Sequence, residues 1–208
     1  MREDTRSGRK HQAIIDAATD VFLRKGYLGA SMDEIAARAA VSKKTVYNHF
    51  ADKERLFTEI VVAATDEVDG VVRHVADTIG GSTDLRRDLR VLARGLLGAV
   101  TQPRLLQIRR LIIASSDRFP ELGRIWYERG FERVLVTLGS AFEQHAAHGD
   151  LVLDDPLVAA HHFAGLLLWI PMNRAMFRGD PELGSKAELD RYAAAAVETF
   201  LRAYGARR

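Results

Sequence analysis

The chain has 208 residues, 47% of them hydrophobic and 28% charged, which is enough to bury a substantial core. It contains no cysteine, which excludes a disulfide framework, a thiolate nucleophile and a cysteine-ligated zinc site, and agrees with a reducing cytoplasm. The first 13 residues are polar rather than signal-like, and the longest nearly apolar stretch, residues 163–172, is about half of the ~20 residues that span a bilayer. We therefore expect a soluble, cytoplasmic protein with no membrane segment.

The net charge of +2 is too small to indicate a nucleic-acid partner, but the charges are unevenly distributed along the chain. Residues 1–55 hold eleven Lys or Arg and eight Asp or Glu, a net charge of +3, whereas residues 56–208 carry a net charge of −1. No acidic residue lies between positions 42 and 51, where two lysines and a histidine stand close together. This distribution predicts a local basic surface near the N-terminus.

The first predicted helix covers about residues 8–25. Ile14, Ala18 and Phe22 recur at the three-to-four-residue spacing of one helix face, which predicts an apolar inward side. Gly26 is a typical stop, because glycine adopts the left-handed conformation that commonly ends a helix. This helix is expected to form the base on which the following helices pack.

The next segment predicts two short helices joined by a tight turn, which is the layout of a helix-turn-helix DNA reader. Ser31 and Glu34 form a capping box at the start of the first short helix, and Ser42 can cap the second. Val46 and Phe50, four residues apart on the second helix, are expected to point inward. The outward positions carry hydrogen-bond donors that suit a phosphate-lined groove: Lys43, Lys44, Thr45, Tyr47, Asn48 and His49.

A long fourth helix is predicted after this reader. Asp52 is a good N-cap, and apolar residues such as Leu56 and Ile60 follow at a four-residue step until the Gly80–Ser82 break. A helix of about 27 residues is ~40 Å long. It is therefore the expected link between the reader and the rest of the chain.

Five further helices are predicted from caps and breakers. They begin near Leu85, at Pro103, near Glu121 after Pro120, at Pro156 after the Asp155 cap, and at the Ser185–Glu188 capping box; Gly149 ends the third of them and Gly179–Pro181 the fourth. No segment shows the alternation of a strand, and no internal repeat is visible. The sequence therefore predicts an all-α fold.

The helix-turn-helix segment and the helix before it resemble a domain of a known family. Residues 11–57 are similar to the N-terminal domain of the TetR family of bacterial transcriptional regulators, and the segment VSKKTVYNHFADKERLF, residues 41–57, is similar to the family signature almost position by position. Residues 109–130, RRLIIASSDRFPELGRIWYERG, resemble the C-terminal domain of an AefR-like subgroup. The resemblance implies an all-helical homodimer, with a three-helix DNA-binding domain over residues 1–55 and a larger ligand-binding and dimerisation domain over residues 56–208.

The DNA-contacting candidates divide into positioning and reading residues. Ser31, Tyr47, His49 and Lys53 match family positions that hold the DNA backbone. Four residues are assigned to contacts with base edges, because lysine donates to guanine, asparagine pairs with adenine and the threonine methyl contacts thymine. They are Lys43, Lys44, Thr45 and Asn48. A solvated basic helix with ordinary caps is the competing interpretation of any single residue in this group.

The helix from Pro156 is apolar nearly all round, and the last helix carries an apolar stripe, which together predict a four-helix dimer interface. The assigned interface residues are Gly165, Leu166, Tyr192, Ala193, Ala196 and Phe200. An intramolecular helical core explains the same stripes. A dimer has a functional reason as well, because two recognition helices must reach successive major grooves, ~34 to 36 Å apart, on a palindromic site.

An apolar pocket with a few polar groups is predicted in the C-terminal half. Its assigned ligand-binding residues are Phe119, Trp126, Phe131, Trp169, Asn173 and Met176. Aromatic residues at helical spacing are also typical of plain core. The identity of the effector is not encoded in any recognisable motif.

The function that fits these features is a ligand-responsive regulator, a repressor by the family default, that binds a double-stranded operator as a homodimer and is released by a small, largely apolar effector. A DNA-binding adaptor or DNA-organising protein without a ligand is the alternative, since it shares every N-terminal feature.

An enzyme is not expected: Ser115, Ser116 and Asp117 lack a G-x-S-x-G elbow, and there is no H-E-x-x-H. Neither a cofactor nor a metal is expected, because adjacent His161 and His162 point to different sides of a helix.

Overall fold

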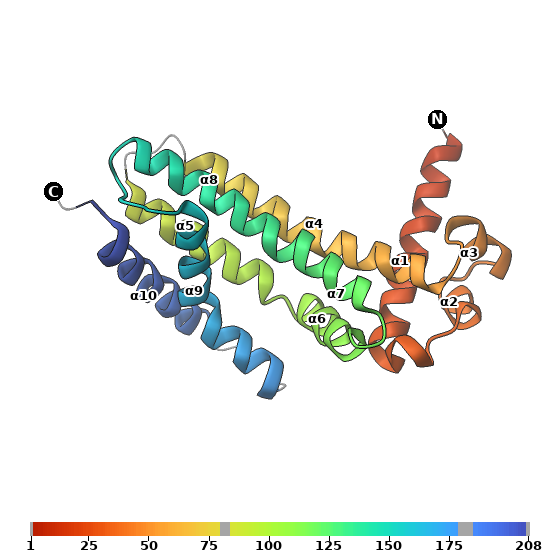
Figure 1. The fold of residues 1–208 in the computed structure, drawn as a ribbon. Helices are drawn as coiled ribbons and strands as arrows, with labels where there is room; N and C mark the ends of the chain where they lie inside the picture. The colour runs from red at the N-terminus through yellow and green to blue at the C-terminus, as the bar shows by residue number, and fades with distance from the viewer. Residues whose placement is uncertain (1, 80–83, 179–184, 207–208) are drawn as a thin grey trace. The chain divides into compact units, whose positions relative to one another are not determined.

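The computed structural model describes residues 2–79, 84–178 and 185–206, and over these ranges the fold is all-α (Figure 1). Besides the helices, one isolated antiparallel bridge pairs Leu151 with Gly205. No helix in the described part of the chain combines the length and the hydrophobicity needed to cross a membrane. The predicted fold class is confirmed.

The helices pack into two compact units, and neither is continuous in sequence. The N-terminal unit comprises residues 1–64 and 107–126, and the C-terminal unit comprises residues 65–106 and 127–208. These units are defined by the packing of the helices. The predicted division after residue 55 follows the helix-turn-helix motif instead, and it stays a prediction about function.

The N-terminal unit contains the short helices of the reader and segments from the middle of the chain. Its elements are α1 (Arg2–Gly29), α2 (Met32–Arg38), α3 (Lys43–His49), the first part of α4 (Lys53–Ile79), most of α6 (Pro103–Ser115) and α7 (Pro120–Trp126). Helix α1 starts at Arg2 rather than near residue 8, and Gly8 lies inside it. Gly26 interrupts it with a φ of 71°, as its glycine predicts.

The predicted N-caps of the reader are confirmed. The Ser31 hydroxyl accepts a hydrogen bond from the backbone N–H of Glu34 at 3.2 Å, and the Asp52 carboxylate accepts one from the N–H of Arg55 at 2.7 Å. The carboxylate of Glu34 does not return to the start of α2 as a capping box requires, because it forms an ion pair with Lys25 at 2.8 Å. This pair ties α2 to α1.

The hydrophobic core of the N-terminal unit is shared by the reader and by α6 and α7. Ile35 of α2, Val46 of α3 and Phe57 of α4 are fully buried there. Ile112 of α6 and Leu122 of α7 belong to the same core, with exposed fractions of 3% and 0%. The reader is therefore completed by residues that follow it by about 50 positions or more in the sequence.

The C-terminal unit is a helical bundle built around α9. Its elements are the later part of α4, α5 (Leu85–Val100), the π-helix η1 (Tyr127–Glu132), α8 (Arg133–Ala147), α9 (Pro156–Arg178) and α10 (Lys186–Tyr204). The predicted starts at Asp155 and Ser185 are confirmed: the first side chain accepts from the N–H of Leu157 at 2.8 Å and the second from that of Glu188 at 3.2 Å. The predicted Gly80–Ser82 break and Gly179–Pro181 stop lie outside the described residues.

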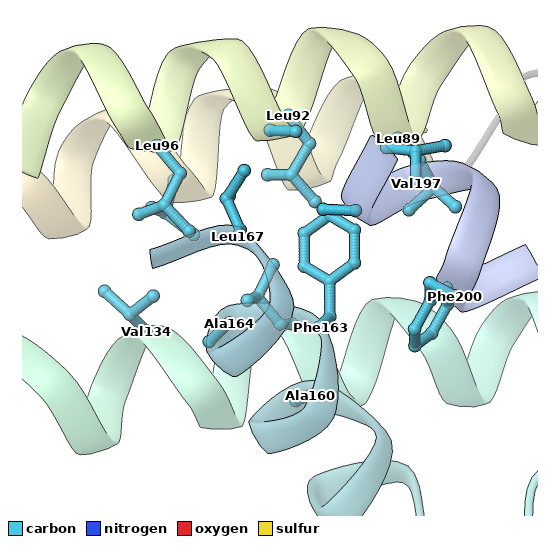
Figure 2. Packing of buried hydrophobic residues seen from close by; sticks show 14 of the residues in the cluster. Leu89, Leu92, Leu96, Val134, Ala160, Phe163, Ala164, Leu167, Val197 and Phe200 are labelled. Carbon is cyan, nitrogen blue, oxygen red and sulfur yellow. The ribbon is translucent and has the colours of Figure 1, made fainter. Parts of the chain in front are cut away.

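Helix α9 packs against α5, α8 and α10. Figure 2 shows Phe163 and Leu167 of α9 pointing into a cluster of leucines from α5 and phenylalanine and valine from α10. Phe163 is fully buried, and its ring lies 5.2 Å from that of Phe200. The opposite side of α9, with Leu166, Trp169 and Ile170, is exposed among the described residues.

The predicted single helix from 121 to 148 is wrong in its middle. Helix α7 passes into the π-helix η1 before α8 begins. Gly130 of η1 lies so close to α4 that a Cβ atom there would be 2.9 Å from the Cγ2 atom of Thr65. Glycine permits this close approach because it has no Cβ atom. The spacing of apolar residues alone cannot distinguish an α-helix from a short π-helical segment.

The core contribution of α6 can be tested with two neighbouring isoleucines, since Ile112 is buried and Ile113 is 59% exposed. Ile112→Ala should lower the free energy of unfolding by about 2–4 kcal/mol through lost burial and the cavity left behind. The matched Ile113→Ala change should stay within about 0.5 kcal/mol. Denaturant unfolding measures both, and equal effects of the two substitutions would contradict the placement of α6 in this core.

Candidate nucleic-acid interface

The turn of the helix-turn-helix is formed by Ala39, Ala40 and Val41. Ala40 adopts a left-handed φ of 53°, the only such non-glycine residue in the described chain, and the N–H of Val41 donates to the carbonyl of Ala36 at 3.1 Å. Ser42 then caps α3 by accepting from the N–H of Thr45 at 3.1 Å. These local bonds set the direction in which α3 leaves the turn.

Helix α3 has one buried and one exposed side, as predicted. Val46 and the following Phe50 are fully buried in the core of the N-terminal unit. Lys43, Lys44, Tyr47 and Asn48 are exposed, and Tyr47 keeps 46% of its surface accessible. The buried side therefore fixes α3, and the exposed side presents ammonium, phenol and amide donors.

Thr45 and His49 are only partly exposed, and both have partners within the unit. The hydroxyl groups of Thr45 and Ser42 share a hydrogen bond of 2.8 Å. The His49 ring meets the His11 ring of α1 edge-on at 5.7 Å, and His11 in turn stacks on Phe50 at 4.9 Å. The contribution of His11 was missed, because nothing in the sequence links the polar start of α1 to the end of α3.

Lys43 is paired with an acidic residue that sequence reasoning missed. Its Nζ atom lies 2.7 Å from Oδ1 of Asp33, in the first turn of α2. The hydrogen bond and the charge of Asp33 raise the pKa of the Lys43 ammonium. The charge of Lys43 is therefore partly compensated within the protein, although both side chains are exposed.

Lys53 lies at the start of α4 and its ammonium is turned toward the end of α1. Nζ donates to the carbonyl of Tyr27 at 2.9 Å and to that of Ala30 at 3.0 Å, and it lies 4.7 Å from the centre of the Tyr27 ring. Burial lowers the pKa of this ammonium. Because an ammonium has three N–H donors, one remains for a further acceptor. Ser31, the next residue after Ala30, is exposed at the start of α2.

The six predicted ligand-binding residues are divided between the two units. Phe119 and Trp126 pack on the core of the N-terminal unit, where the Phe119 ring meets that of Tyr27 edge-on at 4.4 Å. Arg109 lies over the Trp126 ring at 5.6 Å. The other four belong to the C-terminal unit, so neither unit collects the whole set in one cavity.

The four candidates in the C-terminal unit have different surroundings. Phe131 packs against the core of this unit, and Met176 packs beside Leu106. Trp169 is 71% exposed, and the side-chain amide of Asn173 donates to its carbonyl at 2.7 Å. The structure thus places two of these residues on or near the exposed side of α9.

The predicted dimer residues also fall into two groups. Gly165 and Leu166 lie on the exposed side of α9, and Leu166 is 45% exposed. Ala193, Ala196 and Phe200 of α10 are buried within their own subunit, and Tyr192 is half-buried with its hydroxyl donating to Glu188 at 3.2 Å. The apolar stripe of α10 thus belongs to the intramolecular core, which was the alternative interpretation of that pattern.

The hydroxyl groups of Ser115 and Ser116 both donate to backbone carbonyls of α6. The Ser115 hydroxyl donates to the carbonyl of Leu111 at 2.8 Å, and that of Ser116 donates to the carbonyl of Ile113 at 2.9 Å. His145 is buried, with Nδ1 3.1 Å from the carboxylate of Asp150. Over the described ranges, no three His, Cys, Asp or Glu side chains are grouped as a metal ion requires.

Comparison with known families gives two matches that together cover most of the chain. Residues 14–60 match the bacterial regulatory proteins of the tetR family, and residues 87–206 match the C-terminal domain of AefR-like transcriptional repressors. Among curated relatives, the transcriptional activator FasR of Mycolicibacterium smegmatis is 41% identical over 85 residues, which are 41% of this chain and 37% of FasR. The repressor TetR of Mycobacteroides abscessus is 37% identical over 94 residues, 45% of each chain. These matches therefore span less than half of either relative.

Solved structures are similar over nearly the whole chain. A TetR-family transcriptional regulator from Mesorhizobium loti is 48% identical, with a TM-score of 0.89 and coverage of 96% of this chain and 98% of that one. The flavonoid-responsive regulator FrrA is 30% identical, with a TM-score of 0.76 and coverage of 97% and 100%. With one family match spanning more than half of the chain and a relative at 48% identity over almost its full length, this chain belongs to the TetR family of bacterial transcriptional regulators.

Proposed function

We propose that the protein is a transcriptional repressor that binds a palindromic operator as a homodimer in the cytoplasm and releases it when a small, largely apolar effector binds. The observation that carries this proposal is the α3 helix, which is held by a capped turn and buried Val46 while its other side exposes Lys44, Tyr47 and Asn48. Family membership supports a ligand-responsive DNA-binding regulator. The match to AefR-like repressors over residues 87–206 favours repression.

The roles at the DNA follow from the contacts. Lys44 and Asn48 are exposed and are proposed to reach base edges, with Lys43 and Thr45 beside them. Ser31, Tyr47 and His49 are proposed to hold phosphates. Lys53 is proposed to contribute its remaining N–H to a phosphate while its other two donors fix the end of α1.

Dimerisation is proposed to use the exposed side of α9. Leu166, Trp169, Ile170 and Phe177 expose between 45% and 84% of their surface in the single chain. An exposed apolar row of this kind is typical of a protein–protein interface. Gly165 on the same side allows close approach of a second helix. Among the predicted α10 residues, Tyr192 alone retains surface for a partner.

The effector is proposed to act through a shift in population between DNA-binding and released arrangements. Phe119 and Trp126 are attached to the core of the DNA-binding unit, so a ligand that displaces them acts on the unit that holds α3. Phe131, Asn173 and Met176 remain proposed ligand contacts in the C-terminal unit. FrrA is described as flavonoid-responsive, so flavonoids are a suitable first class of compounds for screening.

The test is a titration of the purified protein against DNA from its own upstream region and against random DNA, at two salt concentrations, followed by anisotropy. The expected result is a specific complex of paired subunits whose affinity falls steeply with salt, as ~6 to 10 phosphate contacts imply. Lys44→Gln should weaken the specific complex about tenfold, because one contact to a base is worth roughly 1–3 kcal/mol. Lys186→Gln, an exposed lysine at the start of α10, is the matched control and should have no effect. Equal affinity for both DNAs would favour the adaptor, and no binding to either would overturn the proposal.

Asp33→Asn should strengthen DNA binding about two- to fivefold at low salt. The substitution removes a negative charge beside the recognition helix and releases Lys43 from its ion pair. Asp154→Asn, another exposed acidic residue, controls for the change in net charge. The same anisotropy titration measures both variants, and weaker binding by the Asp33 variant would show that this carboxylate positions Lys43 for DNA.

Trp169→Glu should convert the dimer into a monomer, because a buried tryptophan anchor typically contributes about 2 kcal/mol or more to an interface and a carboxylate cannot be desolvated there. Val91→Glu is the control, since Val91 of α5 is 49% exposed and lies outside the proposed interface. Sedimentation equilibrium gives the mass of each variant. A dimer that survives Trp169→Glu would place the interface elsewhere.

A further inference from the structure

The N-terminal unit contains a hollow that none of the predicted DNA-binding or ligand-binding residues line. It has a volume of about 640 Å³ and lies between the end of α1, Arg38 at the end of α2, and α6. This volume is within the range of ~300 to 1,000 Å³ that is common for small-molecule sites. We call it the arginine hollow, after Arg24, Arg38 and Arg110 in its lining.

The arginine hollow combines an apolar wall with a positively charged lining. Leu23 and Leu111 are partly buried, and both pack against the core of the N-terminal unit. Three arginines face one acidic residue, Asp20, so the lining carries a net charge of +2. A surface of this composition favours a ligand that has both an apolar body and a negative charge.

Two of the arginines are held in position. Nε and Nη2 of Arg38 both donate to Oδ2 of Asp20, at 3.3 Å and 2.6 Å, which orients the guanidinium and leaves its Nη1 donors for another acceptor. Nε of Arg24 donates to the backbone carbonyl of Asp20 at 3.3 Å, so its charge is not matched by a carboxylate there. An oriented guanidinium loses less conformational entropy on binding an anion than a free one does.

Gly26 keeps one side of the hollow open. Its φ of 71° turns the chain at the end of α1, and a Cβ atom built on it would meet no atom within 4 Å. The wall at this point is therefore backbone next to empty space. A ligand can approach it without displacing a side chain.

We propose that the arginine hollow binds a small amphiphilic anion, a carboxylate or sulfonate attached to an aromatic or aliphatic body. The apolar body lies against Leu23 and Leu111, and the anionic group accepts hydrogen bonds from Arg24 and Arg38. This site is separate from α3 and from the five proposed effector contacts. It does not depend on the function proposed above, because it requires only the folded N-terminal unit.

The test uses two probes that differ mainly by one charged group. 8-Anilino-1-naphthalenesulfonate carries a sulfonate, and N-phenyl-1-naphthylamine has the same aromatic body without it. Calorimetric titration of the full chain with the sulfonate should show one site per chain that the double variant Arg24→Gln, Arg38→Gln weakens about tenfold. The uncharged probe should bind the double variant and the unchanged protein equally.

Arg55→Gln with Arg87→Gln is the matched control, since both arginines are exposed and outside the hollow. It removes the same charge and should leave the sulfonate site intact. Arg24→Gln alone provides a milder variant whose side chain makes no ion pair, and it should still weaken the sulfonate severalfold. Circular dichroism establishes that each variant is folded.

Three results would overturn the proposal. The first is an affinity for the sulfonate probe that is the same in the double variant and in the unchanged protein. The second is an equal loss of affinity for both probes in the double variant. The third is displacement of the sulfonate from this site by operator DNA, which would assign the arginines to phosphate contacts. If the protein binds no DNA but binds the sulfonate in the charge-dependent way, the proposed repressor function is refuted and the proposed anion site in the arginine hollow is supported.

Discussion

Helices α2 and α3 have seven residues each, and a helix of that length is not stable alone in water. Their conformation depends on burial of Ile35, Val46 and Phe50 in one core with α1 and α4. Serine caps at both N-termini satisfy backbone donors but contribute only about 1 kcal/mol each. The geometry of the reader is therefore a property of the whole core.

This dependence extends to residues that are distant from the helix-turn-helix in the sequence. Ile108, Ile112 and Leu122 belong to the same core as α2 and α3, so residues 107–126 are structurally part of the reader. The chain passes from one unit to the other inside α4 and inside α6, and again where α7 meets η1. A displacement of α6 or α7 therefore directly changes the packing that holds α3.

Local signals in the sequence predicted most helix starts, because a cap or a proline acts within three or four residues. Ser31, Ser42, Asp52, Asp155 and Ser185 all cap the helices assigned to them. The partner of an apolar face is not a local property, so the pattern could not show that Ala193 and Phe200 face their own chain rather than a second subunit. For the same reason it could not show that α6 completes the reader, or that Gly130 accommodates Thr65 in a widened turn.

The candidate site was predictable in residue type but not in electrostatics. The sequence places Lys43, Lys44 and Lys53 in the helix-turn-helix region but does not show which groups they pair with. In the structure, Asp33 pairs with the first and two carbonyl groups take two donors of the third. Lys44 thus presents the least compensated positive charge of the three. Because exposed charges supply most of the sequence-independent attraction to DNA, under the DNA roles proposed above this arrangement lowers general affinity and leaves a larger share of binding to the residues proposed to reach base edges.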